Sequence, residues 1–350
     1  MQYKDILTLL LDRQSLPHDA MLAAMRALMG GEYTPAQIAG FLVALRMKGE
    51  SVTEVAAAAE VMRELSTKVP LSGVEHLVDT CGTGGDGAHT FNISTAAAFV
   101  AAACGARVAK HGGRSVSSTS GSADVLEALG VNVNLAPEQV AEAVKTLGVG
   151  FMFAPNHHSA MKHAAPVRRE LGVRTLFNML GPLTNPAGAP NQVMGVFSRE
   201  LTCTLARVLH TLGSRHVMVV YAEEGLDEIS LASPTFVAEL KDGHVSEYEL
   251  EPGLFGLPQV AASELVVNGK DEAVEMLLAA LENRHAGAAA IVAINAGAAI
   301  YVSGRSASLM EGVAQAQGAI ASGAARDTLE RYRRFSQSST ASQSNAASQT

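Results

Sequence analysis

From about residue 75 onward, short apolar runs typical of β-strands alternate with helical patterns. The strand-like runs lie at residues 76–80, 107–110, 150–154, 192–197 and 216–221. The helical patterns between them lie near residues 95–104, 121–129, 137–147 and 200–212. This alternation is typical of βαβ units, in which helices cover a mostly parallel sheet. A hairpin around Lys241-Asp242-Gly243 is expected within residues 232–250, and residues 270–335 return to helix.

The first 70 residues or so show helical patterns and no strand-like run. Two capping boxes, Thr34-Pro35-Ala36-Gln37 and Ser51-Val52-Thr53-Glu54, mark helix starts there. Four short helices without strands predict a small helical domain in residues 1–72. The Ser/Gln/Ala-rich residues 336–350 have the low complexity of a disordered tail. We therefore expect an α/β protein in which a small helical domain accompanies a larger α/β domain.

The composition excludes several classes of protein. Hydrophobic residues make up 48% of the chain and charged residues 17%, which excludes wholesale disorder. The net charge of −8 argues against a generic nucleic-acid coat or a polybasic membrane binder. The three cysteines form no CxxC pair, so a reducing, cytoplasmic location is expected. The most apolar stretches, 96–103 and 286–302, are shorter than the ~20 residues of a membrane span, so no membrane partner is expected.

A glycine-rich run, Asp79-Thr80-Cys81-Gly82-Thr83-Gly84-Gly85-Asp86-Gly87, lies between the first strand-like run and the next helix. Glycines allow positive φ angles and let backbone N–H groups close on an anion, and the helix N-terminus adds partial positive charge. More short polar side chains than one helix cap needs come next: Thr90, Asn92, Ser94 and Thr95. The run therefore predicts a phosphate-binding loop in preference to a tight turn without a ligand.

The same run does not fit the common nucleotide-binding motifs. Gly82, Gly84 and Gly87 match G-x-G-x-x-G, but a dinucleotide fold also needs an acid about 20 residues later for the ribose hydroxyls. No Asp or Glu occurs between Asp86 and Asp124. The P-loop pattern G-x-x-x-x-G-K-[ST] is also missing. NAD binding and a Walker-type NTPase are therefore disfavoured.

A second polar loop spans residues 110–122 and reads KHGGRSVSSTSGS. Its Lys supplies a point charge and its Arg a fork for phosphate oxygens, while hydroxyls and backbone N–H groups add hydrogen bonds. Because both loops follow parallel strands, they should meet at the carboxyl edge of the sheet. Together they predict a site for a phosphate or pyrophosphate; a solvated Ser-rich loop is the alternative interpretation.

Two further segments carry candidate ligands. Asp227 and Glu228 follow the strand-like run at 216–221 and are good Mg²⁺ ligands if a polyphosphate lies nearby, although such pairs are more often simply solvated. His157, His158 and His163 invite a zinc interpretation. Their spacing does not place all three on one helix face and no HExxH occurs, so zinc is disfavoured. A basic, histidine-lined wall for an aromatic or carboxylate substrate is favoured, with His157 and His163 as ordinary surface or core histidines.

Six segments occur together and in order, and their combination is highly specific. They are DTCGTGGDG (79–87), NIST (92–95), KHGGRSVSS (110–118), HHSAMKHAAPVRRELG (157–172), NMLGPLTNP (178–186) and GLDEIS (225–230). With them the chain closely resembles the anthranilate phosphoribosyltransferase family of the tryptophan pathway. The resemblance implies an active site in the cleft between the two domains and a homodimer formed by the helical domains. It also implies that the helical domain takes in residues of about 165–185, which leaves 73–164 and 186–335 for the α/β domain.

The resemblance implies a reaction: phosphoribosyl pyrophosphate and anthranilate combine through the anthranilate amine, and pyrophosphate is released. The donor would be held by Gly82, Gly85, Asp86, Thr90, Asn92, Ser94, Thr95, Lys110, Ser118 and Ser122. Mg²⁺, the implied cofactor, would bind Ser94, Asp227 and Glu228. Anthranilate would meet Gly82, Gly113, Pro155, His158 and Arg168, with Arg168 at its carboxylate. The catalytic candidates are Arg168 and His111, the latter as a general base.

One position departs from the family pattern. The second loop commonly reads KHGN, with the Asn amide near anthranilate, whereas this chain has Gly113 there. Because this amide contact with anthranilate is missing, the motifs specify the identity of the donor more closely than the identity or affinity of the acceptor. Two alternatives stay open: a pyrimidine nucleoside phosphorylase, which uses inorganic phosphate and needs no Asp-Glu metal pair, and a non-catalytic paralogue that binds nucleic acid. The acidic net charge and the intact polar loops disfavour the second alternative.

Overall fold

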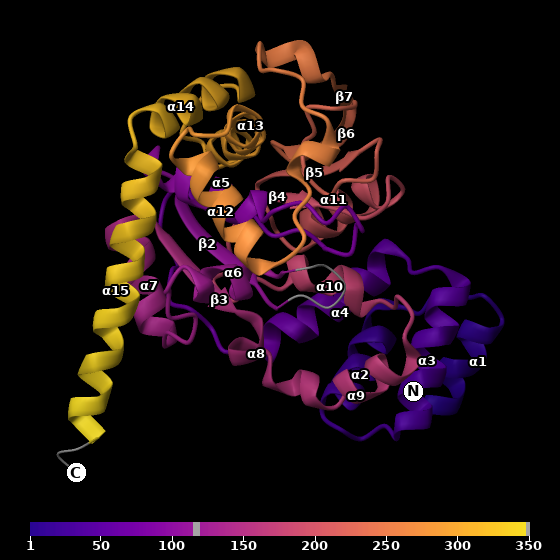
Figure 1. Cartoon of the computed structure of the whole chain (residues 1–350). Coiled ribbons are helices and arrows are strands. Elements are labelled where there is room, and N and C mark those ends of the chain that lie inside the picture. Colours follow the sequence, from indigo (N-terminus) through magenta and orange to yellow (C-terminus); the bar gives the residue numbers. More distant parts are fainter. Residues whose placement is uncertain (115–119, 348–350) are drawn as a thin grey trace.

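The computed structural model describes residues 1–114 and 120–347, with side chains of the last helix described as far as residue 338. In these residues seven strands form one sheet in the order β3-β2-β1-β4-β5-β6-β7 (Figure 1). The strands are β1 (Leu77–Asp79), β2 (Arg107–Gly112), β3 (Val149–Phe153), β4 (Asn191–Gly195), β5 (His216–Ala222), β6 (Thr235–Lys241) and β7 (His244–Leu250). β1 to β5 pair in parallel, and β6 and β7 add an antiparallel hairpin. The predicted mostly parallel sheet is confirmed.

Both faces of the sheet are buried because successive side chains of each strand point in opposite directions. In β5, Met218 and Val220 enter one hydrophobic core, and Val217 and Val219 enter another. Such two-sided burial is typical of strands inside a helix-covered sheet. The expected hairpin turn joins β6 to β7, and its two residues, Asp242 and Gly243, both have positive φ angles (51° and 78°) that suit the strand twist.

Helices cover the two faces (Figure 1). The first core packs against α5 (Ile93–Ala103), α6 (Ser122–Ala128), α12 (Lys270–Leu281), α13 (Ala286–Val302), α14 (Leu309–Ala321) and α15 (Ala324–Ala347). On the opposite face, α7 (Pro137–Leu147) packs against β2 and β3, and α11 (Leu201–Thr211) packs against β5. α13 and α14 meet closely at two glycines, since a Cβ on Gly312 would lie 2.4 Å from the carbonyl oxygen of Gly297. Within the described residues no single helix is both long and apolar enough to cross a membrane; only α12 and α13 pass that test as a pair, and they are bent by 75°.

The N-terminal helices form a separate bundle, drawn in indigo in Figure 1. They are α1 (Tyr3–Leu11), α2 (His18–Met29), α3 (Pro35–Lys48) and α4 (Val52–Glu64), and both predicted capping boxes are present. α9 (Ala165–Leu171) and α10 (Phe177–Leu183) come later in the sequence but share the core of this bundle through Val167, Phe177 and Leu180. The same core continues onto the sheet face under α11, so the bundle and the sheet are joined by apolar packing.

The expected disordered tail differs from the structure. α15 continues to Ala347, so the backbone of residues 336–347 is helical, while residues 348–350 lie outside the described residues. Contacts with the body of the protein hold the first turn of this segment: the buried Ser336 hydroxyl accepts from the Asn132 N–H (3.0 Å), and Gln337 donates to the Gly130 carbonyl (2.8 Å). Ala and Gln are also favourable helix residues, which a low-complexity criterion does not register.

Candidate active site

The carboxyl ends of parallel strands bring the predicted polar segments to one edge of the sheet. β1 ends at Asp79 and leads into residues 82–87, here called the donor loop. β2 carries Lys110 and His111 near its end, and the chain reaches Asp227 and Glu228 shortly after β5. This edge is where ligands bind in open α/β sheets.

The donor loop presents backbone N–H groups that have no hydrogen-bond partner among the described residues. Gly84, Gly85 and Gly87 have φ angles of 63°, 74° and 75°, a conformation that favours glycine. The Thr83 N–H donates to the Gly195 carbonyl (2.9 Å), which anchors the start of the loop. Within residues 1–114 and 120–347, the backbone N–H groups of Gly85, Asp86 and Gly87 have no hydrogen-bond partner. Successive N–H groups in such a turn form an anion-binding concavity.

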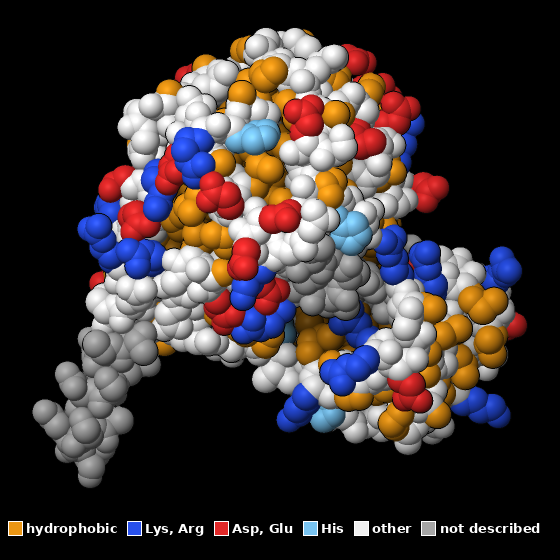
Figure 2. Space-filling view, in the orientation of Figure 1, with side chains coloured by type: hydrophobic (Ala, Val, Ile, Leu, Met, Phe, Trp, Pro, Cys, Tyr) orange, Lys and Arg blue, Asp and Glu red, His pale blue; other side chains and the backbone are white. Residues whose placement is uncertain are grey.

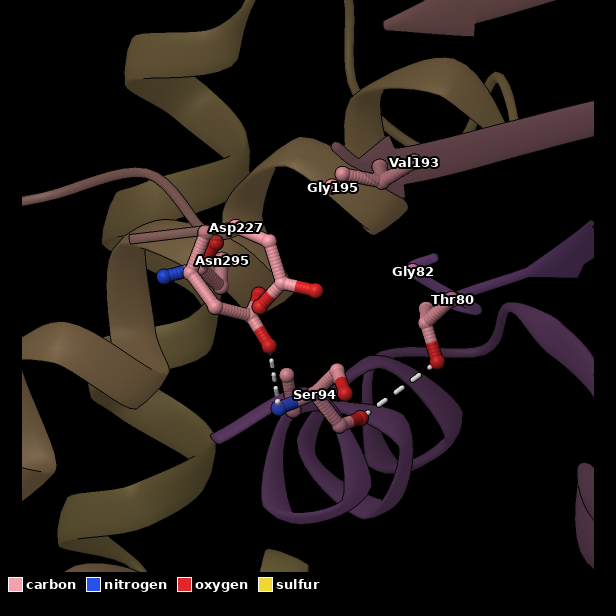
Figure 3. Close-up of a pocket in the computed structure, with 9 residues that line it drawn as sticks. Thr80, Gly82, Ser94, Val193, Gly195, Asp227 and Asn295 are labelled. Atoms are coloured by element: carbon pink, nitrogen blue, oxygen red, sulfur yellow. Dashed lines mark hydrogen bonds between the residues drawn. The ribbon is translucent and has the colours of Figure 1, made fainter. Parts of the chain in front are cut away.

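A buried lysine ties the donor loop to the start of α5. The Lys110 ammonium donates to the Thr80 carbonyl (2.6 Å) and to the Ser94 hydroxyl (3.2 Å). The Thr80 hydroxyl in turn donates to the Ser94 carbonyl (3.3 Å), as Figure 3 shows. Lys110 is only 4% exposed, so its positive charge is directed at this edge of the sheet instead of into solvent.

The other predicted donor residues are distributed around the N-terminus of α5. Asn92 donates to the Ser120 carbonyl (3.2 Å), and the Ser120 hydroxyl donates back to the Asn92 side chain (3.3 Å), which ties the two polar loops together. Thr90 pairs with Val266 as an isolated β-bridge. The Thr95 hydroxyl is buried and has no partner among the described residues.

Asp227 and Glu228 lie across from these groups in a small cavity, which Figure 3 shows in close-up. Asp227 accepts from the Gly84 N–H (3.0 Å), and Glu228 accepts from the Ser94 N–H (3.1 Å). Both residues are half-buried. Burial therefore raises both pKa values; the nearby Asp86 adds to the rise at Asp227, and Asp227 adds to it at Glu228.

This set of groups suits Mg²⁺. Two adjacent carboxylates and a serine hydroxyl are the hard oxygen donors that Mg²⁺ prefers, with substrate phosphates completing the shell. The raised pKa values indicate that Lys110 does not offset the burial of the two carboxyl groups, and a bound cation would supply the missing positive charge. Gly82 and Gly195 let the Asp227 segment approach, since a Cβ on Gly195 would meet the Asp227 carbonyl oxygen at 1.5 Å. Among the described residues there is no cluster of three or more His, Cys, Asp or Glu side chains suited to a metal.

Two histidines form a second part of the site, which differs from the carboxylate part in its charge. The rings of His111 and His158 lie 5.1 Å apart, and both residues are buried. Burial and the neighbouring histidines lower the pKa of His111 to about 3 and that of His158 to about 4, so both rings are neutral near pH 7. The His111 Nδ1 lies 3.2 Å from the Gly181 carbonyl oxygen. Both Nε2 atoms are buried without a partner among the described residues.

The structure places the other predicted acceptor residues as follows. Arg168 lies in α9, half-buried, with its guanidinium 5.1 Å from the Phe177 ring centre; burial lowers its pKa. Pro155 lies exposed in α8 (Ala154–His157). His157 is buried, and its Nδ1 lies 2.8 Å from the Thr67 carbonyl oxygen, which agrees with a structural role.

The second polar loop is only partly described. Ser118 lies outside the described residues, and Ser122 begins α6 with its hydroxyl 3.4 Å from the Gly113 carbonyl. A Cβ on Gly113 would meet nothing within 4 Å in the described residues. The arginine of this loop, Arg114, pairs with Asp124 (2.9 Å) and Glu127 (2.6 Å). Its guanidinium therefore holds α6 in this structure, where the sequence suggested a fork for phosphate oxygens.

Sequence reasoning missed one residue that contacts the donor loop. Arg174, between α9 and α10, donates to the Gly85 carbonyl and lies 4.0 Å from the ring centre of Phe197. By sequence alone, its segment at 174–186 is interpreted only as hinge and packing. A peptide's C=O and N–H point in opposite directions, so holding the Gly85 carbonyl also orients the Asp86 N–H. The sequence did offer one signal, since this arginine lies beside a segment with several Pro and Gly residues that connects the two domains.

Comparison with known proteins agrees with this arrangement. The helical bundle domain of a glycosyl transferase family matches residues 4–66, and the α/β domain of that family matches residues 74–326. The fold and site therefore define a glycosyl transferase. An anthranilate phosphoribosyltransferase of Thiobacillus denitrificans is 62% identical over 94% of this chain and 96% of its own length. The corresponding protein of Methylibium petroleiphilum is 61% identical over 92% of this chain and 94% of its own length. The chain belongs to the anthranilate phosphoribosyltransferase family.

Solved structures extend the agreement to the whole fold. The anthranilate phosphoribosyltransferase of Thermus thermophilus matches with a TM-score of 0.90 and 45% identity, over 95% of this chain and 99% of that one. The enzyme of Saccharomyces cerevisiae in complex with PRPP and Mg matches with a TM-score of 0.81 and 29% identity, over 92% of both chains. The chain transfers the 5-phosphoribosyl group from phosphoribosyl pyrophosphate to the amine of anthranilate and releases pyrophosphate, a step of tryptophan biosynthesis. The phosphorylase alternative is disfavoured by these matches.

Proposed function

We propose that the donor loop and the acidic pair together bind phosphoribosyl pyrophosphate with Mg²⁺. The N–H groups of Gly85, Asp86 and Gly87 would receive phosphate oxygens, and Asp227 and Glu228 would hold the cation together with the Ser94 hydroxyl. One observation carries this proposal: Asp227 accepts from the Gly84 N–H (3.0 Å), directly beside the three N–H groups that have no partner among the described residues. The yeast relative solved with PRPP and Mg supports the same pairing of donor and cation.

The remaining donor residues would surround the ribose and phosphate groups. Lys110 would supply fixed positive charge, since it is held by Thr80 and Ser94. The set assigned to the donor is Gly82, Gly85, Asp86, Thr90, Asn92, Ser94, Thr95, Lys110, Ser118 and Ser122. Mg²⁺, when bound, would neutralise charge that develops on the leaving pyrophosphate. Preorganised N–H donors act in the same direction because they need no reorganisation as the charge builds.

We assign the acceptor to the histidine side of the site. Anthranilate is a flat, apolar ring with a carboxylate and an amine. Neutral buried rings at His111 and His158 suit the flat ring, and the half-buried Arg168 suits the carboxylate. Gly82, Gly113 and Pro155 complete the assigned set. A yeast relative solved with 4-fluoroanthranilate supports an acceptor site of this kind in the family.

His111 would orient the amine instead of removing its proton before attack. The Gly181 carbonyl can only accept, so the His111 Nδ1 carries the hydrogen and Nε2 is the acceptor. A pKa of about 3 makes this ring a weak base. It can accept a hydrogen bond from the amine, and an aryl amine attacks unprotonated, with its proton leaving afterwards. Holding both substrates in line supplies much of the remaining barrier reduction.

The direct test follows anthranilate fluorescence with the protein, phosphoribosyl pyrophosphate and Mg²⁺, with EDTA as the control. A Mg²⁺-dependent decay supports donor, acceptor and metal together. Decay that persists in EDTA would overturn the metal assignment. If the fluorescence does not decay but calorimetry still detects donor binding, the donor assignment stands and the acceptor assignment around Gly113 is wrong.

We further propose a cytoplasmic homodimer. The helical part would comprise residues 1–72 and about 165–185, with the α/β part in 73–164 and 186–335. Leu11, Val43 and Met47 on α1 and α3 are 68%, 37% and 73% exposed. Figure 2 shows hydrophobic side chains gathered on the outer surface of this part. Apolar side chains grouped in this way mark protein–protein interfaces. Light scattering after size exclusion should give twice the 36.4 kDa chain mass, and Met47→Glu should shift it toward one chain.

A further inference from the structure

One buried amide interrupts the most apolar helix of the protein. Asn295 is the one polar residue buried within α13, all of which the structure describes, and it is 3% exposed. Burying an amide costs free energy unless its donors and acceptor are paired. An Asn in the middle of Ala, Ile and Val therefore calls for specific partners.

Two of those partners are the backbone N–H and C=O of a single residue, Ile229. The Asn295 Oδ1 accepts from the Ile229 N–H (2.9 Å), and its Nδ2 donates to the Ile229 carbonyl (3.0 Å). The second hydrogen of Nδ2 goes to the Ile291 carbonyl within α13 (2.9 Å). The Asn295 side chain thus pairs with both the N–H and the C=O of Ile229, as the backbone of a neighbouring β-strand would.

Ile229 directly follows the acidic pair, in a segment that has no helix or strand of its own. Asn295 lines the same cavity as Asp227 and Glu228, and Figure 3 shows it on the side of the cavity opposite Thr80. The carboxylates of the pair accept from the Gly84 and Ser94 N–H groups, which belong to the donor loop and the start of α5, and the Asp227 N–H lies 3.5 Å from the Asp86 carboxylate. Both of these segments are proposed above to bind the donor. The contacts of Asn295 use no group assigned to the donor, so the donor does not compete for them.

We propose that Asn295 is a positioning residue for the metal site. By fixing both backbone groups of Ile229, it would hold the main chain from which Asp227 and Glu228 project, so that both carboxylates are aimed at one cation. This inference rests on the metal role proposed above for the acidic pair. Partners outside the coordination shell typically change metal affinity or activity by about 10- to 100-fold when they are removed.

Two variants separate positioning from general stability. Asn295→Leu keeps the size but removes every hydrogen bond, and Asn295→Ser is smaller and keeps a hydroxyl, so it serves where the Leu variant does not fold. The matched control is Val302→Ala, which removes buried side-chain atoms from the same helix (Val302 is 1% exposed) but does not line the cavity. The readouts are the Mg²⁺ activation constant, KM for anthranilate, Tm, and Mn²⁺ binding with pyrophosphate followed by electron paramagnetic resonance.

We expect the Asn295 variants to raise the Mg²⁺ activation constant and weaken Mn²⁺ binding by about 10- to 100-fold. KM for anthranilate should stay unchanged, and Val302→Ala should lower Tm while leaving Mn²⁺ binding intact. Unchanged Mn²⁺ binding in a folded Asn295 variant, with a lowered Tm, would overturn the proposal and leave Asn295 a structural residue. Asp227→Asn with Glu228→Gln is the reference: if that double variant also binds Mn²⁺ normally, the metal assignment itself fails.

Discussion

The site has two sides, and burial affects them in opposite ways. On the carboxylate side, Asp227 and Glu228 have raised pKa values because the protein excludes water without supplying enough positive charge. On the histidine side, burial and the neighbouring histidine and lysine side chains lower the pKa values of His111 and His158. Both shifts favour neutral groups in the free protein. The carboxylate side still lacks positive charge and therefore suits a cation, whereas the histidine rings are neutral near pH 7 and suit an aromatic ring.

The largest expected effect comes from removing the charge of the carboxylate side. Asp227→Asn with Glu228→Gln keeps shape and size but removes both anionic ligands. Because metal-assisted stabilisation of a leaving phosphate contributes several kcal/mol, kcat/KM should fall by about 1,000-fold or more. Steady-state kinetics at saturating Mg²⁺ provide the measurement. Activity within tenfold of the unmodified protein would show that this side does not hold the cation.

The second effect should appear only on the histidine side. Arg168→Gln removes the charge proposed to meet the anthranilate carboxylate. Hydrogen bonds to charged groups contribute about 1.5–3 kcal/mol, so KM for anthranilate should rise by about 10- to 150-fold while KM for the donor stays within a few-fold. Arg199→Gln is a matched control, since Arg199 also lies over an aromatic ring (Phe236, 3.5 Å). A rise in donor KM in place of acceptor KM would reverse the assignment of the two sides.

The sequence predicted where the acidic pair lies better than it predicted the partners of the site. Asp227 and Glu228 follow a strand, and parallel strands deliver their ends to one edge, so periodicity and motif together located them. The partners that complete the site come from positions without a motif. Asn295 is remote in sequence, and Arg174 reaches the donor loop across a domain crossing. Arg114 fitted the phosphate-binding pattern, yet it pairs with Asp124 and Glu127, because sequence does not say which partner a charged side chain meets.

The opposite pKa shifts predict opposite effects of pH on the metal-free protein. Burial raises the pKa of Asp227 to about 7 and of Glu228 to about 8, so the folded state binds more protons than the unfolded state, and stability falls as pH rises through that range. The histidines have lowered pKa values, so their contribution is lost as pH falls from 6.5 toward 4. Of the two sides, only the carboxylate side changes its protonation between pH 6.5 and 8. In EDTA, Tm should therefore fall across this range, and the Asp227→Asn, Glu228→Gln variant should lose that slope. An unchanged slope would mean that other groups cause it.

The smallest expected effect is at Gly113, where the chain departs from the family pattern. Gly113 does not have a positive φ, and a Cβ there would meet nothing within 4 Å in the described residues, so Gly113→Asn should fold without loss of Tm. A new amide at the edge of the histidine side would add one neutral hydrogen bond to anthranilate. Such a bond contributes about 0.5–1.5 kcal/mol, so KM for anthranilate should fall by about 2- to 12-fold, with donor KM and the Mg²⁺ activation constant unchanged. Gly113→Ala, which adds the Cβ without the amide, is the control. If the Ala variant lowers KM equally, backbone restriction and not the amide is responsible; if the Asn variant changes donor KM alone, residue 113 faces the carboxylate side and the proposed division of the site is wrong.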